Sequence, residues 1–247
     1  MLYFLAWRDI KVRYKQTALG VVWVVLQPLL MMAIYSVFFD RLAKVPSGGF
    51  PYPLFIFSGL LPWQLFASAV ADCGNSLVAN QNLITKVYFP RLVIPIAAVL
   101  PRLVDFVCAF IVLLGMMLYF GVSPTWTLWT LPFFVLLAVT TSVAAGLWLS
   151  ALNVRFRDVR YLIPFLIQVW FFLTPVAYPT SLVPEGWIRL YGLNPMVAAV
   201  ECFRWSLLGK GEASAATLGM STVVLVVVLV SGLYYFRSVE KSLADIV

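Results

Sequence analysis

A chain of 247 residues, 63% hydrophobic and only 11% charged, lacks the polar surface of a soluble domain, in which about a quarter of residues are charged. Its mean hydropathy of +0.97 predicts an all-α integral membrane protein with several spans and little soluble mass. The net charge of +7 then indicates a basic membrane face rather than a nucleic-acid partner. The chain has no histidine, and Cys73, Cys108 and Cys202 lie far apart, so we expect neither a metal site nor a disulfide framework.

The first segment, residues 1–19, combines aromatic and basic residues and leads into a charge-free run. In helical projection Trp7 and Tyr14 fall on one stripe, with Arg8 and Lys11 on the adjacent one. This pattern predicts an amphipathic helix at the cytoplasmic membrane interface, not a cleaved signal peptide. Two interpretations stay open: a topology anchor, or a platform for an anionic lipid headgroup such as a pyrophosphate. The candidate headgroup-binding residues are Trp7, Arg8, Lys11, Arg13 and Tyr14.

Six apolar runs are long enough to cross the roughly 30 Å hydrocarbon core as helices. They cover residues 20–39, 53–71, 92–120, 128–152, 161–178 and 217–236. Of the 17 lysines and arginines, eleven fall on the side that holds both termini, five fall on the other side, and Arg102 lies within a span. The positive-inside rule therefore predicts that both termini are cytoplasmic.

The connection between the second and third spans contains a short apolar, aromatic segment, residues 82–91, closed by a proline. An apolar segment on the cytoplasmic side is expected to pack against something, and the composition leaves two packing partners open: its own helix bundle or a partner subunit. The candidate contact residues are Asn82, Lys86, Tyr88, Phe89 and Arg91.

Arg102 and Asp105 are the only charged residues inside a predicted span. Their spacing of three places them on one helix face, and charges at membrane depth are usually paired or functional. We expect a structural intrahelical ion pair that faces the bundle.

Aromatic residues are frequent in the first and fifth spans. One interpretation is the ordinary interfacial belt together with lipid-facing packing. The other is a conduit lined by rings, on which sugar faces stack through their C–H groups. The candidate channel aromatics are Tyr35, Phe38, Phe39, Trp170, Phe172 and Tyr178.

The external connection 179–216 is too long for a plain loop. Asn194 followed by Pro195 predicts the start of a helix, and an apolar piece around Trp187 predicts a second short one, together covering about 182–208. They would either dip back into the bundle or lie on the membrane surface as an amphipathic cap.

Taken in order, several strings resemble the ABC-2 type membrane subunit that exports bacterial polysaccharides, in the O-antigen and teichoic-acid branch. The strings are Trp7-Arg8-Asp9-Ile10-Lys11-Val12-Arg13-Tyr14-Lys15-Gln16-Thr17, Gln27-Pro28-Leu29, Leu61-Pro62-Trp63, Lys86-Val87-Tyr88-Phe89-Pro90-Arg91, Arg157-Asp158, Thr174-Pro175-Val176 and Asn194-Pro195. They run through nearly the whole chain in the order of the family.

The resemblance implies one transmembrane domain over residues 1–247 in the bacterial inner membrane, working as a homodimer with two copies of a separate ATPase. ATP and magnesium would bind that ATPase, in agreement with the absence here of a G-x-x-x-x-G-K-[ST] phosphate loop. Segment 82–91 would be the coupling helix, with Arg157 and Asp158 as a second contact, and the external helices would gate the channel. The substrate would be a polyprenyl-pyrophosphate-linked polysaccharide that enters between the first and fifth spans.

Three other functions are weighed against this one. An ABC-2 exporter of a drug or small lipid would share the fold but would leave the aromatic, basic N-terminus without a purpose. A polyprenyl-phosphate enzyme would need clustered carboxylates, whereas Asp9, Asp72, Asp105 and Asp158 are scattered. A proton-coupled transporter using Asp105 conflicts with the neighbouring Arg102 and with the lack of an inverted repeat.

Overall fold

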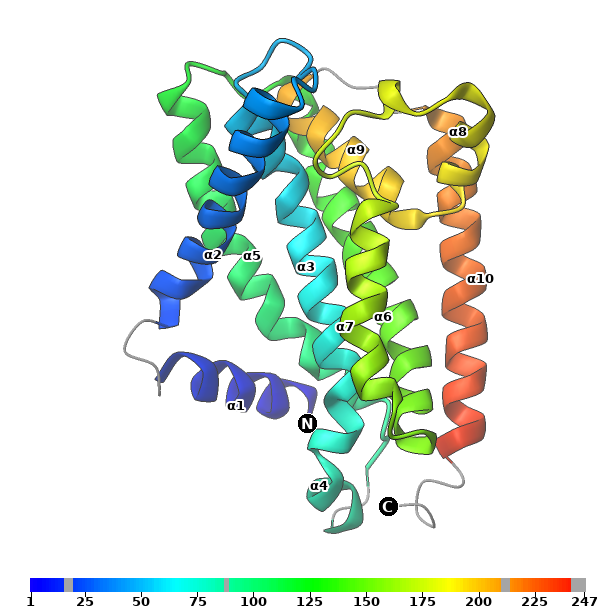
Figure 1. The fold of residues 1–247 in the computed structure, drawn as a ribbon. Coiled ribbons are helices and arrows are strands. Elements are labelled where there is room, and N and C mark those ends of the chain that lie inside the picture. The colour runs from blue at the N-terminus through cyan, green and yellow to red at the C-terminus, as the bar shows by residue number, and fades with distance from the viewer. Residues whose placement is uncertain (16–19, 87–88, 210–213, 241–247) are drawn as a thin grey trace.

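The computed structural model describes residues 1–15, 20–86, 89–209 and 214–240, and all regular structure in these residues is helical (Figure 1). Long helices run side by side between two ends of the molecule. One end carries α1, α4 and the last turns of α10, and is called here the α1 end. The opposite end carries α8 and α9, and is called the α9 end.

The helices follow one another closely along the chain. They are α1 Leu2–Lys15, α2 Gly20–Tyr35 (continued by a π-helical segment, Ser36–Leu42), α3 Tyr52–Ala79, α4 Gln81–Lys86, α5 Val93–Tyr119, α6 Leu131–Arg155 (preceded by a 3₁₀ turn, Trp126–Thr130), α7 Val159–Phe172, α8 Glu185–Gly192, α9 Pro195–Leu208 and α10 Ala215–Glu240.

Five helical stretches of the described chain are long and apolar enough to cross a membrane, one fewer than the six predicted spans. The predicted fifth span, 161–178, is helical only to Phe172, and α7 at 14 residues reaches about 21 Å against a core of ~30 Å. The helix ends there because Pro175 offers no N–H and restricts Thr174 before it. The second predicted span, 53–71, lies within α3, which is longer and continues to Ala79.

The core is built around α3, which packs against α5, α6 and α9. Two glycines allow the close approach of α3 and its neighbours. A Cβ on Gly146 of α6 would overlap the Cys73 side chain, and a Cβ on Gly74 would lie 2.8 Å from Ile163 Cδ1 of α7. Small residues at such crossings are what close helix packing in a membrane requires.

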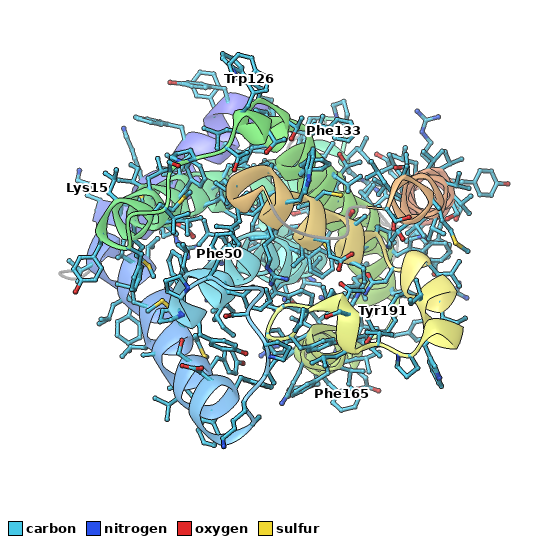
Figure 2. All side chains as sticks on the ribbon, turned by 90° about the horizontal axis from the view of Figure 1, so that it is seen from above. Lys15, Phe50, Trp126, Phe133, Phe165 and Tyr191 are labelled. Carbon is cyan, nitrogen blue, oxygen red and sulfur yellow. The ribbon has the colours of Figure 1, made fainter. Side chains whose placement is uncertain are left out.

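The side chains that point away from the core are largely apolar. Figure 2 views the α9 end and shows Trp126 at the rim, where its side chain is exposed, and Phe50 toward the middle. Phe165 on α7 and Val227 on α10 are further exposed apolar residues. A surface of this kind suits contact with lipid hydrocarbon.

α9 is almost wholly buried within the bundle, so the surface-cap interpretation does not hold for this helix. Asn194 caps it by accepting a hydrogen bond from the Met196 amide at 3.1 Å, and Pro195 occupies its first turn, as the sequence predicts. Gly209 ends it with a positive φ of 67°, which glycine adopts without a steric penalty. α8, by contrast, exposes Trp187 and Leu190.

Gly146→Ala is expected to destabilise the protein by ~1–3 kcal/mol, since the added methyl group meets Cys73 in a packed helix crossing. The measurement is the thermal unfolding midpoint of the purified chain in nanodiscs. Gly115→Ala on α5 is the matched control, because its Cβ meets nothing within 4 Å. Equal midpoints for the two variants would contradict the packing described here.

Candidate functional site

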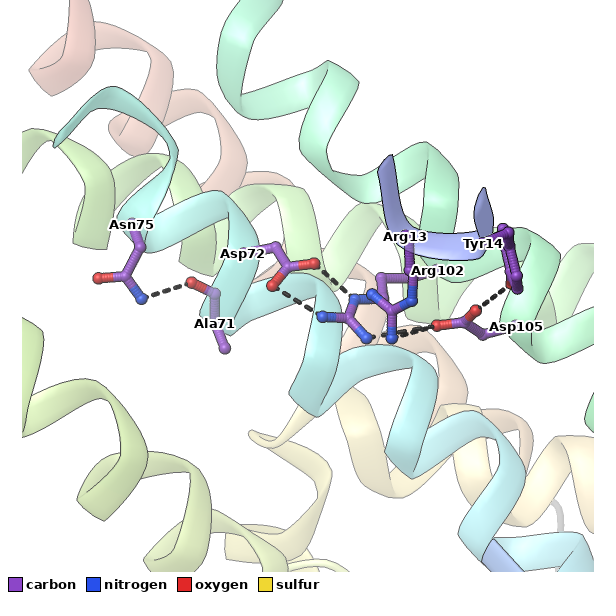
Figure 3. Close-up of polar contacts among 7 residues, drawn as sticks. All are labelled: Arg13, Tyr14, Ala71, Asp72, Asn75, Arg102 and Asp105. Carbon is purple, nitrogen blue, oxygen red and sulfur yellow. Dashed lines mark hydrogen bonds and ion pairs between the residues drawn. The ribbon is translucent and has the colours of Figure 1, made fainter. Parts of the chain in front are cut away.

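A cluster of charged residues lies between α1, α3 and α5 (Figure 3). Arg102 of α5 binds Asp72 of α3 in bidentate fashion, with Nε 2.5 Å from Oδ2 and Nη2 2.8 Å from Oδ1. It also contacts Asp105 on its own helix at 3.3 Å. The intrahelical contact expected from the spacing is therefore present, but the shorter bonds of Arg102 go to a different helix.

Helix α1 completes this cluster through two consecutive residues. Arg13 pairs with Asp105 at 2.9 Å, and the Tyr14 hydroxyl donates to the other Asp105 oxygen at 2.5 Å. Burial and the hydrogen bond to the Asp105 carboxylate raise the pKa of Tyr14, so the phenol stays the protonated donor at neutral pH. Hydrogen bonds to a charged acceptor are stronger than neutral ones, and they fix the end of α1 against α5.

The other candidate residues of α1 lie toward its exposed side. Trp7 is exposed, stacks on Tyr3, and has the Lys11 ammonium 5.4 Å from its ring. Arg8 donates to Asn80 at 2.9 Å, just beyond the last residue of α3, and also contacts Asp9. The aromatic and basic stripes predicted from the sequence thus lie beside each other on a helix that crosses the α1 end.

A cavity of about 370 Å³ opens beside the charged cluster and is walled by α2, α3, α5 and α7, with Arg13 of α1 at its edge. Its volume falls in the ~300–1,000 Å³ range of small-ligand sites. Aromatic and uncharged polar side chains both line its wall, together with aliphatic ones. The aromatic residues are Trp23, Tyr35, Trp63, Phe106, Phe171 and Phe172, and the uncharged polar ones are Gln27, Gln64, Ser68 and Gln168.

Only two of the six candidate channel aromatics line this cavity, namely Tyr35 and Phe172. Tyr35 stacks on Phe171 with ring centroids 5.5 Å apart. Phe39 packs against the core, and Phe38 is 58% exposed on the outside of the bundle.

Trp170 and Tyr178 hold the turn that follows α7. The Trp170 indole donates to Asn194 at 2.9 Å. The Tyr178 hydroxyl lies 2.8 Å from both the Phe172 carbonyl and the Tyr191 hydroxyl. Burial and the hydrogen bond to Tyr191 raise the pKa of Tyr178, so it remains a neutral phenol.

The candidate coupling residues divide into an exposed and a buried set. Asn82 and Lys86 are exposed on α4, whereas Phe89 is buried in a cluster with Leu5 and Ile84. Arg91 binds the end of α10, with Nη1 2.6 Å from the Glu240 carbonyl. Tyr88 lies outside the described residues.

Arg157 and Asp158, the predicted second contact, are both exposed in the turn between α6 and α7, at the α1 end. Phe89 thus packs on its own bundle, while α4 and this turn offer polar groups to the surroundings.

Sequence reasoning missed Asp72 and the three glutamines. The pairing of Asp72 with Arg102 could have been found from the sequence. Asp72 lies about two turns before the end of α3, and Arg102 lies about two and a half turns after the start of α5, which runs antiparallel to it. The two side chains are therefore at a similar depth along the helix pair. The three glutamines carry no charge, so a search for charged residues within the spans does not detect them. Each does interrupt an apolar run, at Gln27, Gln64 and Gln168.

Comparison with known proteins gives a consistent result over nearly the full chain. A family model described as ABC-2 type transporter matches residues 2–208. The O-antigen export system permease protein RfbA of Myxococcus xanthus is 32% identical over 247 residues, which cover 99% of this chain and 94% of the relative. A Klebsiella pneumoniae protein of the same name is 31% identical over 242 residues, with 97% and 92% covered. The polysialic acid transport protein KpsM of Escherichia coli is 23% identical over 246 residues, with 96% and 92% covered.

Asp105→Asn is expected to speed hydrogen exchange of the α1 backbone amides about tenfold, because losing charge-assisted bonds to Arg13 and Tyr14 costs more than ~1.4 kcal/mol. Hydrogen–deuterium exchange of the protein in nanodiscs measures this. Asp9→Asn is the control, since the contact of Asp9 is to its neighbour Arg8 on the same exposed helix. Unchanged exchange in the Asp105 variant would show that the cluster does not hold α1.

Proposed function

Because the chain belongs to the ABC-2 type transporter family, we propose that it is the channel-forming permease of an ATP-driven exporter of polyprenyl-pyrophosphate-linked polysaccharide. The cargo is an O-antigen or a similar cell-surface glycan, moved across the bacterial inner membrane. The names of the RfbA and KpsM relatives support a polysaccharide cargo, and their similarity covers nearly the whole chain.

The observation that carries this proposal is the wall of the 370 Å³ cavity. Aromatic faces bind the apolar C–H faces of sugar rings, and the amides of Gln27, Gln64 and Gln168 donate to and accept from hydroxyl groups. The aromatic faces and the amides hold a sugar through contacts that do not depend on charge.

The cavity lies where the proposed substrate would enter. α2 and α7, the first and fifth predicted spans, form part of its wall, and Arg13 and Arg102 lie at its edge. A pyrophosphate at the membrane interface is attracted by Arg8, Lys11 and Arg13 of α1, and by Arg91 near the start of α5. The glycan then enters between α2 and α7.

The α1 end is the cytoplasmic one in this proposal, which places both termini in the cytoplasm. Exposed Asn82 and Lys86 of α4, together with Arg157 and Asp158, offer polar contacts to a separate ATPase subunit at this end. ATP and magnesium bind that subunit, two copies of which act on two copies of this chain. Its closure pushes α4 and rocks the spans, and the α8–α9 end forms the outer gate.

Lys86→Glu is expected to lower glycan export about tenfold or more, because a reversed charge in a docking contact costs several kcal/mol. The assay is surface glycan in cells whose own permease is deleted, together with ATP hydrolysis of the complex purified with the ATPase. Lys44→Glu, an exposed lysine at the α9 end, is the control. If ATP hydrolysis stays coupled to glycan in the Lys86 variant, α4 is not the coupling element.

Ser68→Trp is expected to abolish export while leaving the complex with the ATPase intact, because an indole at this position fills the cavity between α2, α3 and α7. The control is Val107→Trp on the exposed side of α5. Export is measured as surface glycan, and assembly by co-purification. Normal export through the Ser68 variant would show that the substrate does not use this cavity.

A further inference from the structure

Another cavity, of about 170 Å³, lies at the α9 end, away from the charged cluster and the glutamines. It is bounded by the loop before α3, by the turn after α7 and by α9. Its polar lining includes Ser47, Thr180, Ser181, Glu201 and Arg204. Nothing in the proposed function uses these residues.

Two residues that line this cavity each carry a buried polar atom without a hydrogen-bond partner, Nε of Arg204 and Oγ1 of Thr180. Arg204 is only 6% exposed. A buried polar group without a partner costs ~1–3 kcal/mol, so two of them in one cavity call for a ligand that supplies the missing bonds.

The guanidinium group of Arg204 is held firmly from the other sides. Its Nη2 donates to the Val176 carbonyl at 2.9 Å and to the Pro175 carbonyl at 3.3 Å, and its Cζ lies 3.9 Å from the centre of the Phe55 ring. A Cβ on Gly59 of α3 would overlap this Nη2, so the glycine leaves the room that the group needs. Burial lowers the pKa of Arg204 to about 10, which still leaves it charged at neutral pH.

The charges in the cavity select a neutral ligand. Glu201 lies three residues before Arg204 on α9 and lines the same space, and its carboxylate favours the charged guanidinium. An anion that approached Arg204 would meet Glu201, and a cation that approached Glu201 would meet Arg204. A ligand with hydroxyl groups, which both donate and accept, suits this pair together with the hydroxyls of Thr180 and Ser181.

The volume limits the ligand to one small ring, since sites for larger molecules measure ~300–1,000 Å³. We propose that this cavity binds a single neutral sugar ring, with Arg204 and Thr180 as the residues that recognise its hydroxyls. In the exporter, this site would hold one residue of the glycan at the outer mouth, a role that rests on the proposed function, whereas the binding itself does not.

The test is saturation-transfer NMR on the full chain in nanodiscs, with D-glucose, D-galactose and D-mannose as neutral probes and D-glucuronate as the acidic probe. We expect saturable binding of at least one neutral hexose. Thr180→Val should weaken it about fivefold, the loss of roughly one hydrogen bond, while thermal stability is kept or raised because an unpaired hydroxyl is removed. Thr222→Val on α10 is the matched control, since that hydroxyl bonds to Leu218 within its own helix at 2.8 Å.

A second variant blocks the cavity without touching its buried groups. Ser181 is exposed at the cavity wall, so Ser181→Phe should abolish hexose binding and leave folding unchanged. Absence of saturable binding, preference for glucuronate, or equal affinities for the Thr180 and Thr222 variants would each overturn the proposal. These outcomes do not concern the 370 Å³ cavity, so the Ser68→Trp export assay still decides the proposed function separately.

Discussion

The bidentate ion pair between Arg102 and Asp72 is the contact on which the arrangement of α1, α3 and α5 depends. A charge at membrane depth is costly unless it is paired, so Arg102 must lie where carboxylates reach it. Asp72 supplies one from α3 and Asp105 one from α5, and the second carboxylate then attracts Arg13 and Tyr14. One partly buried cation therefore fixes the depth of α5 against α3 and also the place where α1 docks.

A second constraint acts at the α9 end, where α7 stops inside the bundle and leaves backbone carbonyls without helical partners. Non-helical backbone survives at such depth only where protein groups satisfy it. Asn194 donates to the Leu173 carbonyl, Tyr52 to the Ala177 carbonyl, and Arg204 to those of Pro175 and Val176. The turn after α7 is thus tied to α3 and α9, so a movement of α9 must also move the end of α7.

Hydropathy and turn chemistry predicted most helices well, because span length and the start of α9 at Asn194-Pro195 are local properties. The end of α7 at Phe172 was not predicted, because the apolar run continues through Pro175. A hydropathy count treats proline as an ordinary residue, although proline has no backbone N–H to donate to a helix. Asp72 was left outside the second predicted span because the charge-free run ends at Ala71, whereas in the structure it lies inside α3 and pairs with Arg102. The three glutamines of the cavity are far apart in the sequence, and only the fold brings them to one wall. The sequence also predicted a short element where α4 lies, but the partner of α4 is a proposal.

The charged cluster and the 370 Å³ cavity share Arg13, Arg102 and Asp105. The cluster is balanced, with two arginines against two aspartates, so it holds no free positive charge for a pyrophosphate. In the proposed cycle, a headgroup drawn to Arg13 would compete with the Asp105 carboxylate for the same guanidinium and would remove one of the two contacts, those of Arg13 and Tyr14, that hold α1 to Asp105. Headgroup binding would then oppose the docked position of α1, and a ligand that favours one position over the other shifts the equilibrium between them. The site at which a lipid-linked glycan would arrive is thus also the site that holds the interface helix in place.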